Sequence, residues 1–358
     1  MEMRLNPAFA HLGGIARPRI ENAAFYKMRL QRNEKPFVWP VDVRAAIADA
    51  IDPNLLNHYP DPLPFLRELQ QFIGLNENQL VVTMGIDEAI RSIILLYSAG
   101  DDIFAHPPGY AMYDVYGEIL GRRKHKITYH PDTFLGPKDL CQSLPDDLRI
   151  LFLPNPSQPV ENCFDLDALR KIADWCQINN VLFVIDEAYS LFGAETGLPL
   201  VESHDNVLVL RTFSKAFGAA GLRLGFAAGC EKLISPLNGF RLAHESSSFS
   251  LHAGRLLLQN FDAWVKPNID AVCAGRDQLR EQCRAAGLWA NGHCGNYVLI
   301  KLGDKTQHVV DDLTAQGIFV KGPFKGPLAN YILVTCGPPE MMAEFYEYMA
   351  KSLNNHDR

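Results

Sequence analysis

The chain has 358 residues, of which 47% are hydrophobic and 21% are charged, and its formal net charge is −7. This composition is typical of a globular protein with room for one large α/β unit and a smaller one. The negative charge argues against nucleic acid or an anionic membrane as a partner, and the apolar runs are too short to cross a bilayer. We find no secretory pattern, no Cys-x-x-Cys pair and no metal-ligand spacing, so we expect a cytoplasmic protein with reduced cysteines and no metal site.

The hydrophobic pattern predicts two kinds of unit in chain order. An irregular arm covers residues 1 to about 25, and helical spacing follows at 43–51 and 65–73 around the proline-rich segment 57–64. From Leu80, short apolar strands alternate with polar loops and helices, which predicts a mostly parallel sheet in an α/β/α sandwich. The predicted strands cover 80–84, 102–106, 149–153, 181–185 and 207–210. After about residue 233, a long helix at 252–286 leads into a smaller α+β domain.

The predicted domains are therefore an N-terminal arm with part of the small domain (1–50), a large domain (51–235), and a linking helix with the C-terminal small domain (236–358).

The stretch 211–226 carries the strongest functional signal. It reads Arg-Thr-Phe-Ser-Lys-Ala-Phe-Gly-Ala-Ala-Gly-Leu-Arg-Leu-Gly-Phe, and its glycines predict a bent loop after a strand. Burial would lower the pKa of Lys215, and a partly neutral lysine can form a Schiff base with an aldehyde. Thr212, Ser214 and Arg223 supply the donors that a phosphate ester needs. Taken alone, the same letters also fit an exposed Ser-Lys turn.

Polar residues at the other strand ends favour the functional interpretation, because ligands of parallel sheets bind at the carboxyl ends of the strands. Gly85, Ile86 and Asp87 begin a helix whose N-terminus suits a phosphate. Tyr110 can stack on a ring, Asp186 can pair with a protonated ring nitrogen, and Tyr189 can donate to a ring hydroxyl.

These motifs resemble the fold-type I enzymes that depend on pyridoxal 5′-phosphate (PLP), in the aminotransferase class I/II group that includes histidinol-phosphate aminotransferase. The similarity runs from about residue 29 to 337. It rests on Asn33-Glu-Lys-Pro-Phe, Tyr59-Pro-Asp-Pro, Gly85-Ile-Asp-Glu-Ala-Ile, Pro108-Gly-Tyr-Ala-Met-Tyr, Asp186-Glu-Ala-Tyr, Arg211-Thr-Phe-Ser-Lys-Ala-Phe-Gly and Gly295-Asn-Tyr-Val-Leu-Ile.

The resemblance implies a homodimer with PLP on Lys215, Asp186 at the pyridine nitrogen and Tyr189 at the phenolic oxygen. It implies that Asp87, Thr212, Ser214 and Arg223 hold the phosphate, and that Tyr59 reaches the phosphate in the neighbouring subunit. Lys215, once released by an incoming amine, would act as general base at the substrate α-carbon.

The chain departs from the family pattern at two places. Asn155-Pro-Ser-Gln-Pro-Val-Glu161 replaces Asn-Pro-x-Asn-Pro-Thr-Gly, so Gln158 stands where an asparagine donates to the phenolic oxygen. Leu333 stands where the family has the arginine that clamps the substrate α-carboxylate, and leucine cannot bind a carboxylate. Either the substrate lacks that carboxylate, or another cation replaces the clamp. The candidates are Arg19, Lys35, Arg241, Lys321 and Lys325, and Lys321 is the first choice because it follows a small-domain strand.

The sequence therefore predicts a PLP-dependent aminotransferase that acts on a small amino compound or ketone, with or without a phosphate. Predicted substrate contacts are Lys321, Lys35 and Asn155, and the partners are an amino donor and an acceptor. The alternatives are a PLP-dependent decarboxylase of a phospho-amino acid and a PLP-binding protein without turnover.

Overall fold

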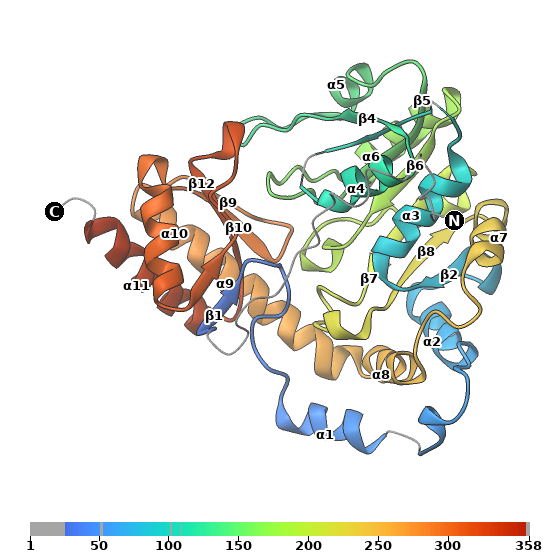
Figure 1. The fold of residues 1–358 in the computed structure, drawn as a ribbon, viewed down its shortest axis with the longest axis horizontal. Coiled ribbons are helices and arrows are strands. Elements are labelled where there is room, and N and C mark those ends of the chain that lie inside the picture. The colour runs from blue at the N-terminus through green and yellow to red at the C-terminus, as the bar shows by residue number, and fades with distance from the viewer. Residues whose placement is uncertain (1–25, 51–52, 101, 108, 356–358) are drawn as a thin grey trace, which may run out of the picture.

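The computed structural model describes residues 26–50, 53–100, 102–107 and 109–355. Its larger unit is built on a seven-stranded sheet with the strand order β2-β8-β7-β6-β5-β3-β4 (Figure 1). Strand β8 runs antiparallel to both of its neighbours, and the other neighbouring strands run parallel. The strands are β2 (Leu80–Thr83), β3 (Ile103–His106), β4 (Arg123–Lys126), β5 (Leu148–Pro154), β6 (Leu182–Asp186), β7 (Val207–Thr212) and β8 (Gly225–Gly229). The predicted mostly parallel sheet is confirmed.

Helices cover both faces of this sheet because its strands are apolar on both sides. In β6, Leu182 and Val184 belong to one buried cluster, whereas Phe183 and Ile185 belong to the other, as the two-residue period of a strand requires. Helices α3 (Gly85–Tyr97), α4 (Ala111–Ile119) and α7 (Glu231–Phe240) contribute to the first cluster, and α2 (Leu63–Ile73), α5 (Pro137–Gln142), α6 (Leu166–Ile178) and α8 (Ser248–Gln259) contribute to the second. The result is the predicted α/β/α sandwich.

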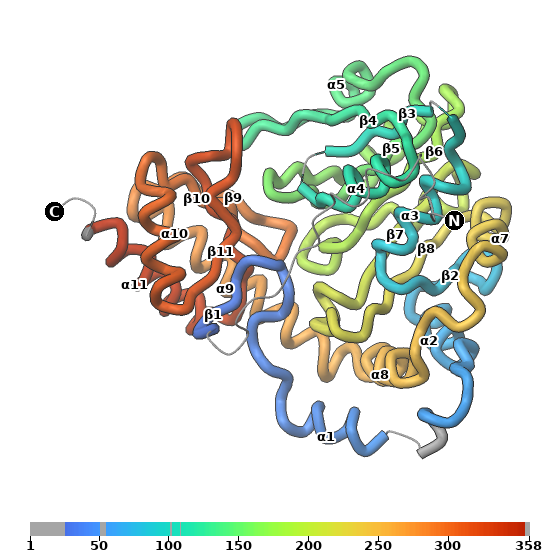
Figure 2. Tube along the Cα trace, in the orientation of Figure 1, coloured from blue at the N-terminus to red at the C-terminus, as the bar shows by residue number. Residues whose placement is uncertain are grey.

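The smaller unit combines two short sheets with three helices. Strands β12 (Tyr331–Thr335), β10 (Tyr297–Lys301) and β9 (Ala290–Asn291) form an antiparallel sheet in that order, and β1 (Met28–Leu30) pairs parallel with β11 (Ile318–Val320). The helices are α9 (Lys266–Ala285), α10 (Thr306–Ala315) and α11 (Pro339–Asn355). Figure 2 shows the first described residues, in blue, beside the red and orange C-terminal part of the chain. The predicted α+β architecture is confirmed, while the predicted boundaries at 50 and 235 stay predictions.

Several elements were absent from the prediction or differ from it. The sequence pattern predicted neither β4 nor β8, and neither α5 nor α7. The long helix expected over 252–286 was wrong: it is two helices, α8 and α9, separated by a π-helical turn at Phe261–Val265. Pro267 lies in the first turn of α9, where its missing N–H is tolerated. Helix α1 (Val41–Asp49) begins close to the predicted position. Among the described helices, none is both long and apolar enough to cross a membrane.

The loop after β5 joins the two units through the carboxylate of Glu161. This carboxylate accepts backbone hydrogen bonds from His293 (2.7 Å), Cys294 (2.8 Å) and Gly295 (3.0 Å), just before β10 begins. The Tyr297 hydroxyl on β10 donates in return to the Ser157 carbonyl at 2.5 Å. The start of β10 is therefore fixed to the sheet edge at which the candidate site lies.

Candidate active site

The residues predicted to form the site meet at the carboxyl ends of the parallel strands. Asp186 ends β6 and Thr212 ends β7, while Gly85 opens the helix after β2. Tyr110 precedes α4, which follows β3. Asp87 acts electrostatically on both Asp186 and Lys215, and Arg223 acts on Lys215, so these segments of the chain converge on one place.

Lys215 lies within this group of side chains, and its amine is bonded to a neutral carbonyl. Its Nζ donates to the Arg32 carbonyl at 3.0 Å and lies 5.7 Å from the ring centre of Tyr189. Burial lowers the pKa of the amine to about 8, and the positive charges of Lys321 and Arg223 lower it further against the opposing effect of Glu34. A fraction of Lys215 is therefore neutral near pH 7 to 8, as a nucleophilic amine must be.

Asp186 is buried and held by two donors. The Tyr113 hydroxyl donates to Oδ2 at 2.6 Å, and the backbone N–H of Ala188 donates to Oδ1 at 3.1 Å. Burial raises the pKa of the carboxyl group to about 6, and both hydrogen bonds oppose that rise. This carboxylate is therefore fixed in place and needs a cation or a protonated ring nitrogen beside it.

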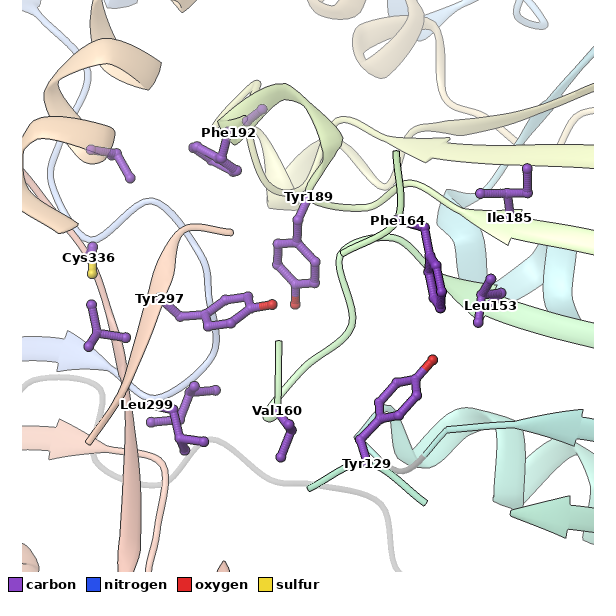
Figure 3. Close-up of a cluster of buried hydrophobic side chains, with 14 of the residues drawn as sticks. Tyr129, Leu153, Val160, Phe164, Ile185, Tyr189, Phe192, Tyr297, Leu299 and Cys336 are labelled. Carbon is purple, nitrogen blue, oxygen red and sulfur yellow. The ribbon is translucent and has the colours of Figure 1, made fainter. Parts of the chain in front are cut away.

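Tyr189 is likewise buried, and its hydroxyl accepts a hydrogen bond from Asn33 Nδ2 at 3.0 Å. Burial raises the pKa of this hydroxyl. The same Asn33 amide lies 3.5 Å from Oε1 of Gln158, so Gln158 and Tyr189 share one neighbour. Figure 3 shows the Tyr189 ring pointing toward Tyr297 of the small sheet, with 5.3 Å between the ring centres.

A set of donors lies at the N-terminus of α3. Arg223 adopts a left-handed backbone conformation (φ 52°) and its Nη1 lies 3.4 Å from Ser214 Oγ, which in turn accepts from Thr212 Oγ1 at 3.0 Å. Gly85 has a φ of +74°, which favours glycine, and a Cβ there would lie 2.9 Å from Arg223 Nη2, so the guanidinium group would have to move away. Helix N-termini with an adjacent arginine bind phosphate groups.

Asp87 and Tyr110 stand beside this cradle and are bonded to each other. The Tyr110 hydroxyl donates to the Asp87 carboxylate, which also lies 3.6 Å from Arg223 Nη2. A carboxylate repels a phosphate, so Asp87 can contribute to anion binding only through its backbone N–H and by orienting Arg223. The Tyr110 ring contacts Tyr113 edge-on with 6.0 Å between ring centres.

Comparison with known proteins shows what kind of site this is. Residues 26–349 match the family model Aminotransferase class I and II. The chain belongs to this family. It is therefore an aminotransferase, a transferase of nitrogenous groups, and pyridoxal 5′-phosphate is the cofactor of the family.

Several relatives of the chain share the name histidinol-phosphate aminotransferase. Histidinol-phosphate aminotransferase 1 of Carboxydothermus hydrogenoformans is 28% identical over 337 residues, 93% of this chain and 94% of that protein. Histidinol-phosphate aminotransferase of Thermoanaerobacter pseudethanolicus is 30% identical over 306 residues, covering 83% and 84% of the two chains. The crystal structure of histidinol-phosphate aminotransferase from Sinorhizobium meliloti, in complex with pyridoxal-5′-phosphate, superposes with a TM-score of 0.86 over 99% of both chains, at 21% identity. This last likeness shows the shared fold.

The donor set of the aminotransferase fits its cofactor. The cradle at Gly85 and Arg223 suits a phosphate, the buried carboxylate of Asp186 suits a ring nitrogen, and the Lys215 amine lies close to the Tyr189 ring. These are the three polar features that a substituted pyridine with a phosphate and an aldehyde requires.

Two residues predicted to contact the substrate, Asn155 and Lys35, are bonded to the main chain. Asn155 is buried, and its amide bonds to the main chain of Phe164 and Glu195 (2.8 to 3.3 Å), so its predicted contact with substrate stays a prediction. Lys35 donates to the carbonyls of Phe37 and Val38, both at 3.3 Å.

Among the cations considered as a replacement clamp, Arg241 pairs with Glu245 at 2.8 Å, and Lys325 is exposed. Arg19 lies outside the described residues. Tyr59 is 81% exposed and stacks on His244.

Two residues of this site were missed as site residues, although both stand in the motifs quoted above. Tyr113 lies in the first turn of α4, three positions after the N-cap residue Tyr110, and the two rings are in edge contact. Asn33 has a positive φ of 53°, and this turn directs its amide to Tyr189.

A buried ion pair lies directly behind the site. The Glu187 carboxylate accepts from Arg211 Nη2 at 2.8 Å and from Nε at 2.9 Å, and Thr196 donates to the same carboxylate. Both charged residues are direct sequence neighbours of residues in the site, Asp186 and Thr212.

Proposed function

We propose that this aminotransferase transfers the amino group of a small phosphorylated amino compound, of the histidinol phosphate type, to a keto acceptor. The Lys215 amine beside Tyr189 is the observation that carries the proposal, because its hydrogen bond goes to the neutral Arg32 carbonyl and not to a carboxylate. The curated relatives that match most of the chain are named histidinol-phosphate aminotransferases, which supports a phosphorylated substrate.

We assign the following residues to the cofactor: Gly85, Ile86, Asp87, Tyr110, Gln158, Asp186, Tyr189, Thr212, Ser214, Lys215 and Arg223, with Tyr59 from the neighbouring subunit. When bound, PLP withdraws electrons from the carbon that carries the substrate amine. Asp186 would keep the ring nitrogen protonated, since its carboxylate is fixed by Tyr113 and Ala188. Tyr189 and Asn33 would orient the phenolic oxygen. Arg223 would offset the charge of the phosphate, and the Ser214 hydroxyl would donate to it.

Lys215 moves the proton at the reacting carbon. A pKa of about 8 means that the free amine and its protonated form are both populated near neutral pH. The amine can therefore accept a proton from the substrate carbon and return it, which is the requirement for a general base that also acts as the acid. The Arg32 carbonyl, 3.0 Å from Nζ, holds the amine between these steps.

A homodimer with Tyr59 in the neighbouring site is part of the proposal. Large apolar side chains are exposed in the N-terminal segment that contains Tyr59 and in the stretch around its stacking partner His244, which favours a protein–protein contact. They are Val38, Val41, Leu56 and Leu63 in the first segment and Leu242 and Phe249 in the second.

Mixing two inactive variants tests this arrangement. Lys215→Ala subunits and Tyr59→Ala subunits, unfolded and refolded together, should form mixed dimers in which one site of the two is intact. Activity should return to about a quarter of the wild-type value, because half of the dimers are mixed. Mixing without any gain would show that Tyr59 acts within its own subunit or not at all.

Spectroscopy of the PLP-loaded protein tests the reaction itself. The amines to titrate are glutamate, phosphoserine, an amino-alcohol phosphate and histidinol phosphate. Conversion of the cofactor to its amine form by one of them, with release of the keto product, is the expected result, and Lys215→Ala should abolish it. Release of carbon dioxide would identify a decarboxylase instead, and binding without any product would identify a PLP-binding protein without turnover.

A further inference from the structure

Lys321 lies at the edge of the small sheet, directly opposite Leu333. The backbone N–H of Lys321 donates to the Leu333 carbonyl at 3.0 Å, and the N–H of Leu333 donates back at 2.8 Å. Two residues that exchange both hydrogen bonds in an antiparallel pair are directly opposed, and their side chains lie on the same face. Lys321 and Leu333 therefore share one face of the sheet.

That face is turned toward the active site. Thr335 lies on the same face of β12 as Leu333, since it follows by two residues, and its hydroxyl contacts Asn33 through N (2.8 Å) and Oδ1 (3.1 Å). Its partner in the register, Tyr297, brings its ring 5.3 Å from Tyr189 (Figure 3). The side chain of Lys321 thus starts on the face that contacts the residues around the cofactor.

Two further observations place the Lys321 charge near the reacting group. In the parallel pair of β1 and β11, Leu30 is opposite Val320, so the next residues, Gln31 and Lys321, continue side by side. The carbonyl that accepts from Lys215 belongs to Arg32, one residue farther along. Consistent with this proximity, the charge of Lys321 lowers the pKa of Lys215.

The Lys321 ammonium lacks an acidic partner among the described residues. Burial alone lowers its pKa, and its aromatic contact is with Phe324, 6.0 Å from the ring centre. By contrast, Lys35 donates to two carbonyls, and Arg241 has a carboxylate partner. A partly buried cation without a counter-ion is unfavourable, and an anionic ligand removes that cost.

Leu333 cannot bind such a ligand. Its side chain is fully buried and lies opposite Leu299 in the register of β10 and β12. Both residues are apolar, so this part of the face excludes charge. Lys321, which follows β11, places a cation on the same face of the sheet.

We propose that Lys321 binds the carboxylate of the keto acid that accepts the amino group, and of the amino acid formed from it, in place of an arginine at position 333. This inference rests on the proposed aminotransferase function. It has a consequence for specificity, because an ammonium group is a point charge and lacks the two-pronged geometry with which a guanidinium group selects a carboxylate. The enzyme should therefore discriminate between amino acids and the corresponding amino alcohols less sharply than an arginine at position 333 would allow.

Steady-state kinetics with paired donors tests this proposal. The donors are glutamate and the amino alcohol in which a hydroxymethyl group replaces its α-carboxylate, with a phosphorylated amino alcohol as a third. The variants are Lys321→Met, which removes the charge, Lys321→Arg, which keeps it, and Lys325→Met, a control at an exposed lysine nearby. Thermal unfolding and cofactor absorbance verify that each variant is folded and loaded.

Lys321→Met should raise the KM for glutamate by about 10- to 100-fold, the effect of one lost charge-assisted hydrogen bond, and change kcat much less. It should leave the KM for the amino alcohol unchanged, and Lys321→Arg should stay within a few-fold of wild type. An equal KM for glutamate in Lys321→Met and Lys325→Met would overturn the proposal, as would an equal loss for both donors.

A loss of affinity confined to a phosphorylated amino alcohol would also overturn it, because Lys321 would then bind phosphate. In each of these cases amino transfer by the wild-type enzyme would still stand, so the proposed function is tested separately.

Discussion

Replacing Glu161 with glutamine tests how firmly the small unit is attached beside the active site. The three hydrogen bonds to the 293–295 backbone all lead to this one carboxylate, and the bonds to Cys294 and Gly295 are partly buried. Glutamine retains one acceptor oxygen, but it loses the charge and turns an NH₂ group toward a backbone N–H. Both partly buried bonds end on Oε1, which the amide oxygen can replace, so they lose their charge assistance. A charge-assisted hydrogen bond exceeds a neutral one by about 1 to 2 kcal/mol, so we expect a loss of about 2 to 4 kcal/mol from the two bonds.

Hydrogen exchange measures this loss at the place where it occurs. The backbone amides of Cys294 and Gly295 should exchange about 30- to 1,000-fold faster in Glu161→Gln, since 1.4 kcal/mol corresponds to a factor of ten. The urea midpoint of unfolding should fall as well. Glu202→Gln is the matched control, because Glu202 is exposed and its replacement removes the same charge. Equal exchange rates in the two variants would refute the view that Glu161 fastens the start of β10.

Three further predictions concern titrating groups in the cofactor-free protein. Folding raises the pKa of Asp186 from 3.8 to about 6, so stability falls as the pH rises through this window. Asp186→Asn should therefore raise the free energy of unfolding at pH 8 by up to about 3 kcal/mol and leave it nearly unchanged at pH 4, in urea titrations at both pH values. Tyr113→Phe removes a hydrogen bond that lowers this pKa, so the pH-dependent fall in stability should move to higher pH. An amine-reactive reagent should label Lys215 with a midpoint near pH 8, measured by mass spectrometry of the labelled peptide. Lys321→Met should raise that midpoint, because it removes a positive charge that lowers the pKa of Lys215. A midpoint near that of exposed lysines would contradict the burial argument.

The strands that carry the site were predictable because each is a continuous apolar run that ends in a polar loop. The two missed strands lack that signal for opposite reasons. β4 reads Arg-Lys-His-Lys at the edge of the sheet, where one face meets water. β8 reads Gly-Phe-Ala-Ala-Gly, and its glycine at 225 is needed because a Cβ there would lie 2.9 Å from the backbone of Gly85. A strand of small residues that permit close backbone contact is not recognised by a search for hydrophobic runs.

The site residues at strand ends were predictable for the same reason, whereas contacts that span both units were not. Asn33 lies 156 positions before Tyr189, and nothing in its local sequence reveals the hydrogen bond between them. The position of Lys321 opposite Leu333 depends likewise on a bridge between two strands, which only the folded sheet brings together. The sequence identified both residues of this pair as unusual but could not show that they face the same way.

The ion pair of Glu187 and Arg211 bears on how the active site tolerates substitution. Successive residues of extended backbone face opposite ways, so Glu187 and Arg211 are bonded to each other on the face opposite to Asp186 and Thr212. The ends of two separate strands are thereby held in a fixed relation by side chains that are not among the proposed cofactor contacts. A substitution at Arg211 would release the ends of both strands at once, although Arg211 itself has no proposed role in the chemistry.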